Sequence, residues 1–275
     1  MKTNHILNAA LIAASLSSAG AVAAGDWKYS LGTDVSSGDY GDVAETEIVS
    51  MPFTASFSPN DRWTFKASLP WTQVEGPGGV IPGGDGGLVL GPGNGNGNGN
   101  GNGNQGSDEI VMTDEAGLGD LWLTGSYSLD PIAGQYFVDL SAKYKVPLAD
   151  EDKGLGTGEA DYTLQTEVFT SIGPYTPFVT LARKFKGDLP EVELRNVWYT
   201  SVGSGYRLND TSSIGASLDY QQAATDTADA QTELFGYFSH KLDNQWSGMV
   251  YAYLGLSDGS PDQGFGVQIS YRPAN

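Results

Sequence analysis

The sequence predicts an all-β fold, an antiparallel transmembrane β-barrel of about 12 strands with short periplasmic turns and long extracellular loops. Three observations support this prediction. Segments that alternate apolar and polar residues recur along the chain. The connections between these segments alternate between short and long. The chain also begins with an export signal, and no later stretch is apolar over the length that a spanning helix requires.

Residues 1–24 have the parts of a secretory signal peptide. The segment starts with a basic residue, is apolar over residues 6–14 and ends in an alanine-rich stretch that suits a signal peptidase. The apolar run is shorter than the roughly 20 residues of a membrane-spanning helix. We expect cleavage after Ala23 or Ala24, a mature barrel of residues 25–275, and export to the outer membrane of a Gram-negative cell.

The composition excludes some functions. The chain has 33 acidic residues and 14 basic ones, which gives a formal net charge of −19. Nucleic-acid binding requires a basic surface, so no nucleic-acid partner is expected. The chain has no cysteine, so it must be stable without the disulfides that many exported proteins use. A single closed, hydrogen-bonded barrel satisfies that requirement at this length.

The hairpin of residues 135–173 shows the alternation most clearly. Its first arm, residues 135–146, places apolar side chains on one face and a polar set that includes Asp139 and Lys143 on the other. This period of two is typical of a β-strand, and the return arm at 161–172 repeats it. In a soluble sandwich the apolar face would form the core. In a membrane barrel the apolar face meets lipid and the polar face lines the lumen.

Three predicted strands precede the longest connection, at residues 26–36, 46–57 and 62–72. An acidic loop separates the first two strands, and the tight turn at 58–61, which contains proline and asparagine, separates the second from the third. The connection at 74–117 contains a Gly-Asn repeat at 93–104. The repeat has no apolar side chain to bury and should be disordered. We expect the whole connection to be a long external loop.

Nine predicted strands follow, at residues 121–129, 135–146, 161–172, 175–185, 194–208, 213–221, 231–242, 245–256 and 264–272. Phe178 and Arg183 fit neither face of their strand well. Short turns alternate with longer acidic, glycine-rich loops and place both chain ends on one side, an arrangement that a soluble sandwich does not require. Aromatic residues near strand ends suit the two interfacial girdles of such a barrel, namely Trp27, Trp63, Trp71, Tyr127, Tyr144, Trp246 and Tyr271.

If the apolar faces meet lipid, the polar faces line a lumen. The predicted lining residues are Asp34, Lys66, Asp120, Asp139, Lys143, Lys145, Asp161, Glu167, Arg195, Arg207, Asp219 and Arg272. Charges of both signs can bias which solutes pass through a pore. Alternatively, they can pair and brace a nearly closed lumen, and for any single residue bracing or general lining is the simpler interpretation. Lys143 and Lys145 are the best candidates for a constriction, because they approach the acidic loop at 150–152.

Three local motifs could suggest other chemistry. The glycine-rich segment at 154–158 lacks the following helix that a phosphate-binding loop needs, and no acidic loop has the calcium-binding pattern. His240 is the only histidine after the signal peptide. Its neighbour Ser239 points to the opposite face of the strand, so the two cannot form a catalytic pair. We expect no enzyme activity, no metal and no cofactor.

Three stretches in this order carry a family resemblance: ASLPWTQVEG at 67–76, GLGDL at 117–121, and KYKVP at 143–147 with GLGTGEADY at 154–162. Together they resemble the outer-membrane barrel family labelled as phenol meta-pathway proteins and often called transporters. The resemblance runs from Trp63 to the C-terminus and implies a barrel that passes small, aromatic or hydrophobic molecules. The Gly-Asn repeat is an insertion, and the chain ends in YRPAN where barrels commonly end on an aromatic residue.

Two classes of function follow. The first is a channel or transporter for passive uptake of small molecules, with aromatic or hydrophobic compounds as candidate solutes. The alternative is a plugged structural or surface barrel, whose acidic loops bind partners or the cations that bridge lipopolysaccharide. A lipid hydrolase is the disfavoured third hypothesis. The expected partners are outer-membrane lipid and lipopolysaccharide, a small-molecule solute and the barrel-assembly machinery.

Overall fold

The computed structural model describes residues 25–42, 44–83, 87–90, 112–187, 189 and 192–274. The predicted signal peptide and Gly-Asn repeat lie outside these residues. The described chain forms a closed antiparallel barrel with 12 strand positions, which confirms the predicted fold class. One position is filled by two consecutive strands, β6 and β7, because both pair with β3.

The strand bounds follow the predicted segments closely. The barrel strands are β1 (Asp26–Gly38), β2 (Thr46–Ser58), β3 (Trp63–Gly76), β6 (Thr113–Leu118), β7 (Leu121–Ser128), β8 (Tyr136–Val146), β9 (Asp161–Thr170), β10 (Tyr175–Phe185), β11 (Val197–Arg207), β12 (Ser212–Gln221), β13 (Gln231–Lys241), β14 (Trp246–Gly255) and β15 (Gln263–Tyr271). No helix in the described part of the chain is long and apolar enough to cross a membrane.

The barrel closes between its first and last strands. β1 and β15 pair from Tyr29 opposite Tyr271 to Ser37 opposite Gln263. Each intervening strand except the short β6, which pairs with β3 alone, also has a neighbour on both sides, so the strands form a closed ring. A membrane interior requires this closure, because it offers no water to satisfy free backbone groups.

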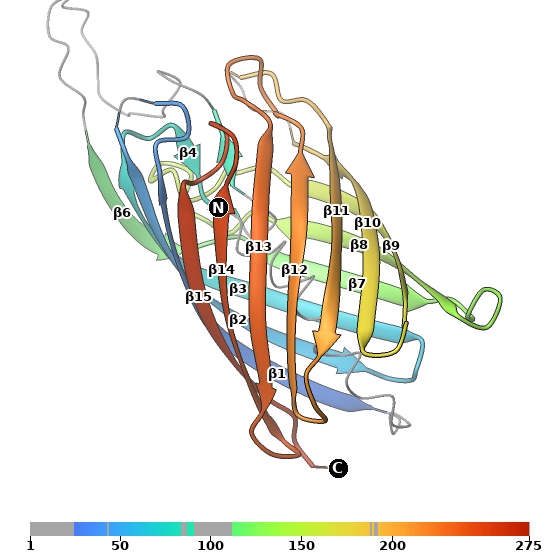
Figure 1. Cartoon of the computed structure of the whole chain (residues 1–275). Helices are drawn as coiled ribbons and strands as arrows, with labels where there is room; N and C mark the ends of the chain where they lie inside the picture. Colours follow the sequence, from blue (N-terminus) through green and yellow to red (C-terminus); the bar gives the residue numbers. More distant parts are fainter. Residues whose placement is uncertain are drawn as a thin grey trace, which may run out of the picture.

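The two ends of the barrel differ in their connections. Residues 59–62, 129–135, 171–174, 208–211 and 242–245 join strands at the end that also holds the C-terminus, named here the short-turn end. Figure 1 shows the turn between β13 and β14 beside the C-terminus and the connection between β12 and β13 at the opposite end of the barrel. That opposite end is named the long-loop end.

The outer and inner faces have opposite polarity. Large apolar side chains on the outer face are half exposed, for example Leu164 at 58%, Val202 at 55% and Phe265 at 54%. Charged residues such as Asp34 and Glu167 are instead buried inside the barrel. An apolar band of this extent is unfavourable in water and suits contact with lipid. The membrane arrangement therefore fits the molecule better than the soluble sandwich.

Aromatic pairs mark the outer face near the short-turn end. The ring centroids of Trp63 and Tyr127 lie 4.8 Å apart, and those of Trp246 and Tyr271 lie 4.7 Å apart. All four residues stand at or near the ends of their strands. Their amphipathic rings suit the boundary between lipid tails and head groups.

The structure resolves the ambiguous face of β10. Phe178 points into the barrel and is buried, whereas Arg183 points outward. The Arg183 guanidinium lies 5.1 Å from the centre of the Trp198 ring, close to the long-loop end. A charge in this position can reach the head-group region while its stem stays in the apolar band.

Two predicted boundaries were wrong. β11 begins at Val197, so Arg195 lies in the preceding loop and not on the strand. The connection predicted at 74–117 is shorter, because β3 continues to Gly76 and β6 begins at Thr113. This connection also contains a hairpin, formed by β4 (Val80–Ile81) and β5 (Leu88–Val89).

Candidate functional site

The β4–β5 hairpin fills the long-loop end of the lumen. Its apolar side chains are buried in two clusters. One cluster joins Val80 and Val89 to Tyr40, Ile48, Val74, Ala149 and Leu155. The other joins Ile81, Leu88 and Leu90 to Leu194, Val197 and Ala224. Because these partners come from strands and from several loops, the hairpin acts as a plug packed against the barrel mouth.

Polar contacts add to the apolar seal. The Leu90 carbonyl accepts hydrogen bonds from the hydroxyls of Thr227 at 2.7 Å and Thr225 at 3.5 Å. Tyr40, in the loop after β1, is buried in the same cap, and burial raises the pKa of its hydroxyl well above its usual range. The cap is therefore neutral and mostly apolar, although the surrounding loops are acidic.

A buried charge network lies next to the cap. Lys145 Nζ is 3.5 Å from Asp120 Oδ2 and 3.3 Å from Asp161 Oδ2, and Lys186 Nζ is 3.1 Å from the same Asp161 oxygen. The nearby cavity, which Ile81 also lines, has a volume of about 20 Å³. This volume suits a water molecule and excludes an organic solute. In this conformation the long-loop end is closed.

The same carboxylates hold two loops against the barrel. Asp120 Oδ1 accepts the backbone N–H groups of Leu148 and Ala149, both at 3.0 Å. Asp161 Oδ1 accepts the Gly187 N–H at 3.0 Å. Each acid thus binds a cation through one oxygen and a loop backbone through the other, so the network braces the closed end.

Other buried carboxylates are held by hydroxyl groups. Asp34 accepts a hydrogen bond from Tyr253 at 3.0 Å. Asp219 accepts one from Tyr199 at 2.7 Å, and Glu167 accepts one from Thr180 at 3.0 Å. These hydrogen bonds form a polar network along the inner wall that ties nearby strands together. Such a network stabilises the barrel as long as its members remain satisfied.

Two tyrosines on β14 lie flat against the inner wall. They face glycines on β15, and a Cβ built on Gly264 would stand 2.1 Å from Tyr253 Cζ, as would one on Gly266 from Tyr251 Cζ. Only glycine leaves room for this close approach. The rings cover the wall and do not cross the lumen, which keeps space open toward the short-turn end.

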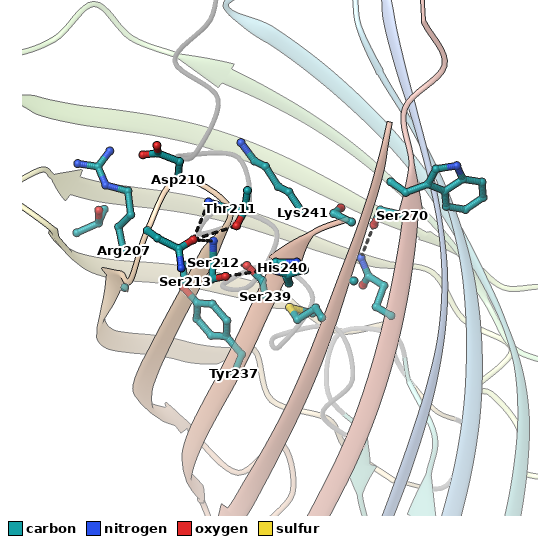
Figure 2. Close-up of a pocket in the computed structure, with 18 of the residues that line it drawn as sticks. Arg207, Asp210, Thr211, Ser212, Ser213, Tyr237, Ser239, His240, Lys241 and Ser270 are labelled. Carbon is teal, nitrogen blue, oxygen red and sulfur yellow. Dashed lines mark hydrogen bonds between the residues drawn. The ribbon is translucent and has the colours of Figure 1, made fainter. Parts of the chain in front are cut away.

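A cavity of about 380 Å³ opens at the short-turn end and is named here the vestibule. Its lining includes the cations Lys28, Arg207, Lys241 and Arg272 and the carboxylates Asp210 and Asp243. Figure 2 shows Arg207, Asp210 and Lys241 near the turns, with Lys241 beside Thr211, and Tyr237 farther from the turns. The volume lies in the range of about 300–1,000 Å³ that is typical of small-molecule sites.

The structure separates the predicted lining residues into groups. Asp120, Lys145 and Asp161 belong to the charge network at the closed end, and Asp34, Glu167 and Asp219 to the hydroxyl-bonded network. Lys66 lies in the electrostatic field of Lys143, Glu167 and Asp139. Arg207 and Arg272 line the vestibule. Whether any of them contacts a passing solute stays a prediction.

Arg195 does not join these groups. It forms an ion pair with Asp226 in a neighbouring loop, and both side chains are largely exposed. Its position on a predicted strand was wrong because β11 starts two residues later.

Sequence reasoning missed several buried polar side chains. Lys184 lies 5.2 Å from the centre of the Tyr199 ring and donates a hydrogen bond to Gln221. Lys28 lines the vestibule and Lys186 joins the charge network. Strand alternation could have identified Lys28 and Lys184. Lys186 follows the end of its strand, so only the folded loop reveals its role.

His240 lies on the outer face near the short-turn end. Its ring stacks on the exposed Phe238, with centroids 6.3 Å apart, and its Nδ1 is 2.9 Å from Ser212 Oγ. Ser239 instead bonds Ser213, which agrees with the predicted opposite faces. Among the described residues no acid or amide orients the other ring nitrogen, so this pair lacks the third member of a catalytic triad.

No group of three or more His, Cys, Asp or Glu residues in the described ranges is arranged to hold a metal ion. The sequence matches no family model. It also matches no curated protein sequence.

Solved structures share the fold at low sequence identity. An outer-membrane channel from Pseudomonas putida F1 is 12% identical, with a TM-score of 0.68, over 92% of this chain and 97% of that one. The NanC porin is 9% identical with a TM-score of 0.53, and the KdgM porin 10% identical with a TM-score of 0.52; each match covers 88% of this chain and 98% of the porin. These likenesses show that the chain shares the barrel fold of these outer-membrane proteins. They do not identify the phenol meta-pathway family.

Proposed function

We propose that this protein is an outer-membrane channel for passive uptake of small molecules, with aromatic compounds as candidate solutes. The observation that carries the proposal is the 380 Å³ vestibule, which lies inside a closed barrel and opens at the short-turn end. A merely structural barrel has no need for such a cavity. The short-turn end is assigned to the periplasm, as in bacterial barrels.

The β4–β5 hairpin is proposed as the gate of this channel. Solute entry from outside requires the hairpin to leave the mouth, because the space beside it holds only about 20 Å³. The hairpin belongs to the connection between β3 and β6, whose ends meet where Gly76 pairs with Thr113. A single long connection can therefore move while the barrel strands stay paired.

The plugged-barrel alternative rests on the same hairpin. Two apolar clusters and the Lys145 network close the long-loop end, and a permanent plug would show these features. In that case the acidic loops would bind cations or partners at the cell surface. The relation to the phenol meta-pathway family and its aromatic solutes is likewise part of the proposal, supported by the motifs at 67–76 and 154–162.

Deletion of the β4–β5 hairpin distinguishes a gated channel from a permanently plugged barrel. Residues 78–111 are replaced by a short Gly-Ser turn between the paired ends of β3 and β6. We expect the variant to show a conductance several-fold above that of the intact protein in planar bilayers and faster uptake of a small sugar by proteoliposomes. The matched control removes only residues 93–104 and should conduct like the intact protein. If the folded hairpin deletion and the intact protein both fail to conduct and to take up the sugar, the barrel is a structural one.

A further inference from the structure

The vestibule combines three features that point to one class of ligand. Positive charge gathers at its mouth, apolar and aromatic side chains line its deeper part, and two buried polar atoms in its wall have no partner. The inference below rests on the proposed channel function and specifies its solute.

The cations at the mouth exceed the acids. Four basic side chains line the vestibule against two carboxylates, in a chain whose overall charge is −19. One of the acids, Asp243, already accepts the backbone N–H groups of Gln245 and Trp246, both at 2.7 Å. In the described residues, no carboxylate lies within ion-pair distance of Lys28, Arg207 or Arg272.

Lys28 and Arg272 are neighbours across the barrel closure. The paired residues Tyr29 and Tyr271 are adjacent to them in sequence, and the charges of Arg272 and Lys66 both repel that of Lys28. Like charges held together inside a barrel attract a counter-ion, and a guanidinium can bind a carboxylate through two parallel hydrogen bonds. The mouth therefore favours an organic anion.

The deeper wall suits a ring. Phe178, Tyr237 and Met249 line this part of the vestibule, and all three side chains are buried. Aromatic and thioether groups form favourable contacts with the face or edge of an aromatic ligand. The ligand thus combines an anionic end with an aromatic body.

Two buried polar atoms complete the pattern. Tyr237 is 7% exposed and Gln268 is 8% exposed, and neither the Tyr237 hydroxyl nor Gln268 Oε1 has a hydrogen-bond partner among the described residues. Both residues line the vestibule. An unpaired buried polar atom is costly, and a ligand with its own polar substituent would satisfy it. Gln268 Oε1 can accept a hydrogen bond from such a group, and the Tyr237 hydroxyl can donate one.

The spacing suits a ligand with one ring. Arg272 directly follows the last residue of β15 and lies four residues beyond Gln268, a span of about 13 Å at roughly 3.3 Å per residue of extended chain. The extended Arg272 side chain and a ligand with one substituted aromatic ring can together span this distance. We propose that the vestibule is a binding site for small aromatic carboxylates that carry a second polar group, with Lys28 and Arg272 holding the carboxylate and Gln268 the substituent.

Titration calorimetry of the detergent-solubilised protein at pH 7 tests the site with 4-hydroxybenzoate. Benzoate, which lacks the hydroxyl, and phenol, which lacks the carboxylate, are the comparison ligands. We expect 4-hydroxybenzoate to bind at least tenfold more tightly than either, and its affinity to fall as salt is raised. Equal affinity for phenol, or no binding of 4-hydroxybenzoate, overturns the proposal.

Substitutions test the roles proposed for Lys28, Arg272 and Gln268. Lys28→Gln combined with Arg272→Gln should weaken binding of 4-hydroxybenzoate at least tenfold. Gln268→Leu should lower the affinity of the protein for 4-hydroxybenzoate to its affinity for benzoate. The same substitution should leave the affinity for benzoate unchanged. Arg62→Gln is the matched control, because Arg62 lies at the same end but pairs with Asp130 outside the vestibule. Unchanged affinity in the folded double variant, or an equal loss in Arg62→Gln, contradicts the site.

The binding test is independent of the channel test. Calorimetry reports on the vestibule even in a protein that never conducts, so binding without conductance would refute the channel and retain the site. Conductance without selective binding would retain the channel and refute the site. Folding of each variant is checked by the shift of the unboiled band on a denaturing gel.

Discussion

At the scale of single residues, pairs of a tyrosine and a facing glycine shape the lumen. Tyr251 and Tyr253 lie against Gly266 and Gly264, and Tyr253 donates a hydrogen bond to Asp34. The glycines allow the rings to lie flat, and the hydrogen bond holds one of them there. The tyrosines stabilise the wall without blocking the space beside them.

Gly266→Ala tests this arrangement. The added methyl group would stand 2.1 Å from Tyr251 Cζ and push the ring into the lumen. Overpacking of this kind costs about 1–3 kcal/mol of unfolding free energy. Urea unfolding in lipid vesicles measures the loss. Gly248→Ala is the control, because its methyl group would meet nothing closer than the Gln268 carbonyl at 4.0 Å. Equal losses at the two positions would argue against the close packing.

At the scale of elements, one lysine connects two strands, the junction between β6 and β7, and a loop. Lys145 on β8 bridges Asp161 on β9 and Asp120 just before β7, and Asp120 in turn holds the loop at 147–160. Lys145 also donates to Thr157 within that loop at 2.8 Å. The loop is therefore fixed by buried charge as well as by the apolar packing of Leu155.

Lys145→Met should destabilise the long-loop end strongly. It removes the cation between two buried carboxylates, and loss of one partner of a buried pair typically costs about 3–5 kcal/mol. Lys153→Met is the control in the same loop. Lys153 lies 3.7 Å from Glu115 with side chains 45% and 40% exposed, so its loss should cost less than about 1 kcal/mol. Heat unfolding followed on denaturing gels compares the two, and similar midpoints would show that the Lys145 network does not brace the barrel.

At the scale of the whole molecule, the reversed polarity of the barrel determines where it is stable. The outer face exposes Leu, Val and Phe side chains on all sides, and the buried interior contains Asp, Glu and Lys. Figure 1 shows the strands tilted around a single closed barrel, which leaves lipid as the medium for the outer face. An outer-membrane channel and a porin share this barrel fold.

Arginine substitutions at two depths test the placement. Leu181 lies near the middle of β10 on the outer face, and Ile172 lies in the turn at its start. On a lipid-facing strand, arginine costs about 2–4 kcal/mol at the bilayer midplane and about 0–1 kcal/mol near the interface. Leu181→Arg should therefore reduce the free energy of unfolding in vesicles much more than Ile172→Arg. Equal effects would contradict the membrane orientation of β10.

The sequence by itself determined the barrel. Alternation with a period of two is a local property of each strand, and the predicted export signal and the connection lengths favour lipid over water as the outer medium. For this reason the bounds of β10 and the faces of Asp139, Lys143 and Glu167 follow from the sequence. Phe178 and Arg183 broke the pattern, because one packs inside the lumen and the other reaches the interface beside Trp198.

Only the tertiary structure decided which end of the lumen is closed and which is open. The apolar residues of the β4–β5 hairpin are few and lie between glycines, so no periodic pattern shows that they fold inward. The Lys145 network joins residues of adjacent strands and loops, whose side chains meet only once the strands are in register. The vestibule combines residues from distant parts of the chain, and Lys28 and Arg272 meet only after β1 pairs with β15 and the barrel closes. Strand alternation gives the face of each residue, but the height at which residues from different strands meet depends on register and loop packing.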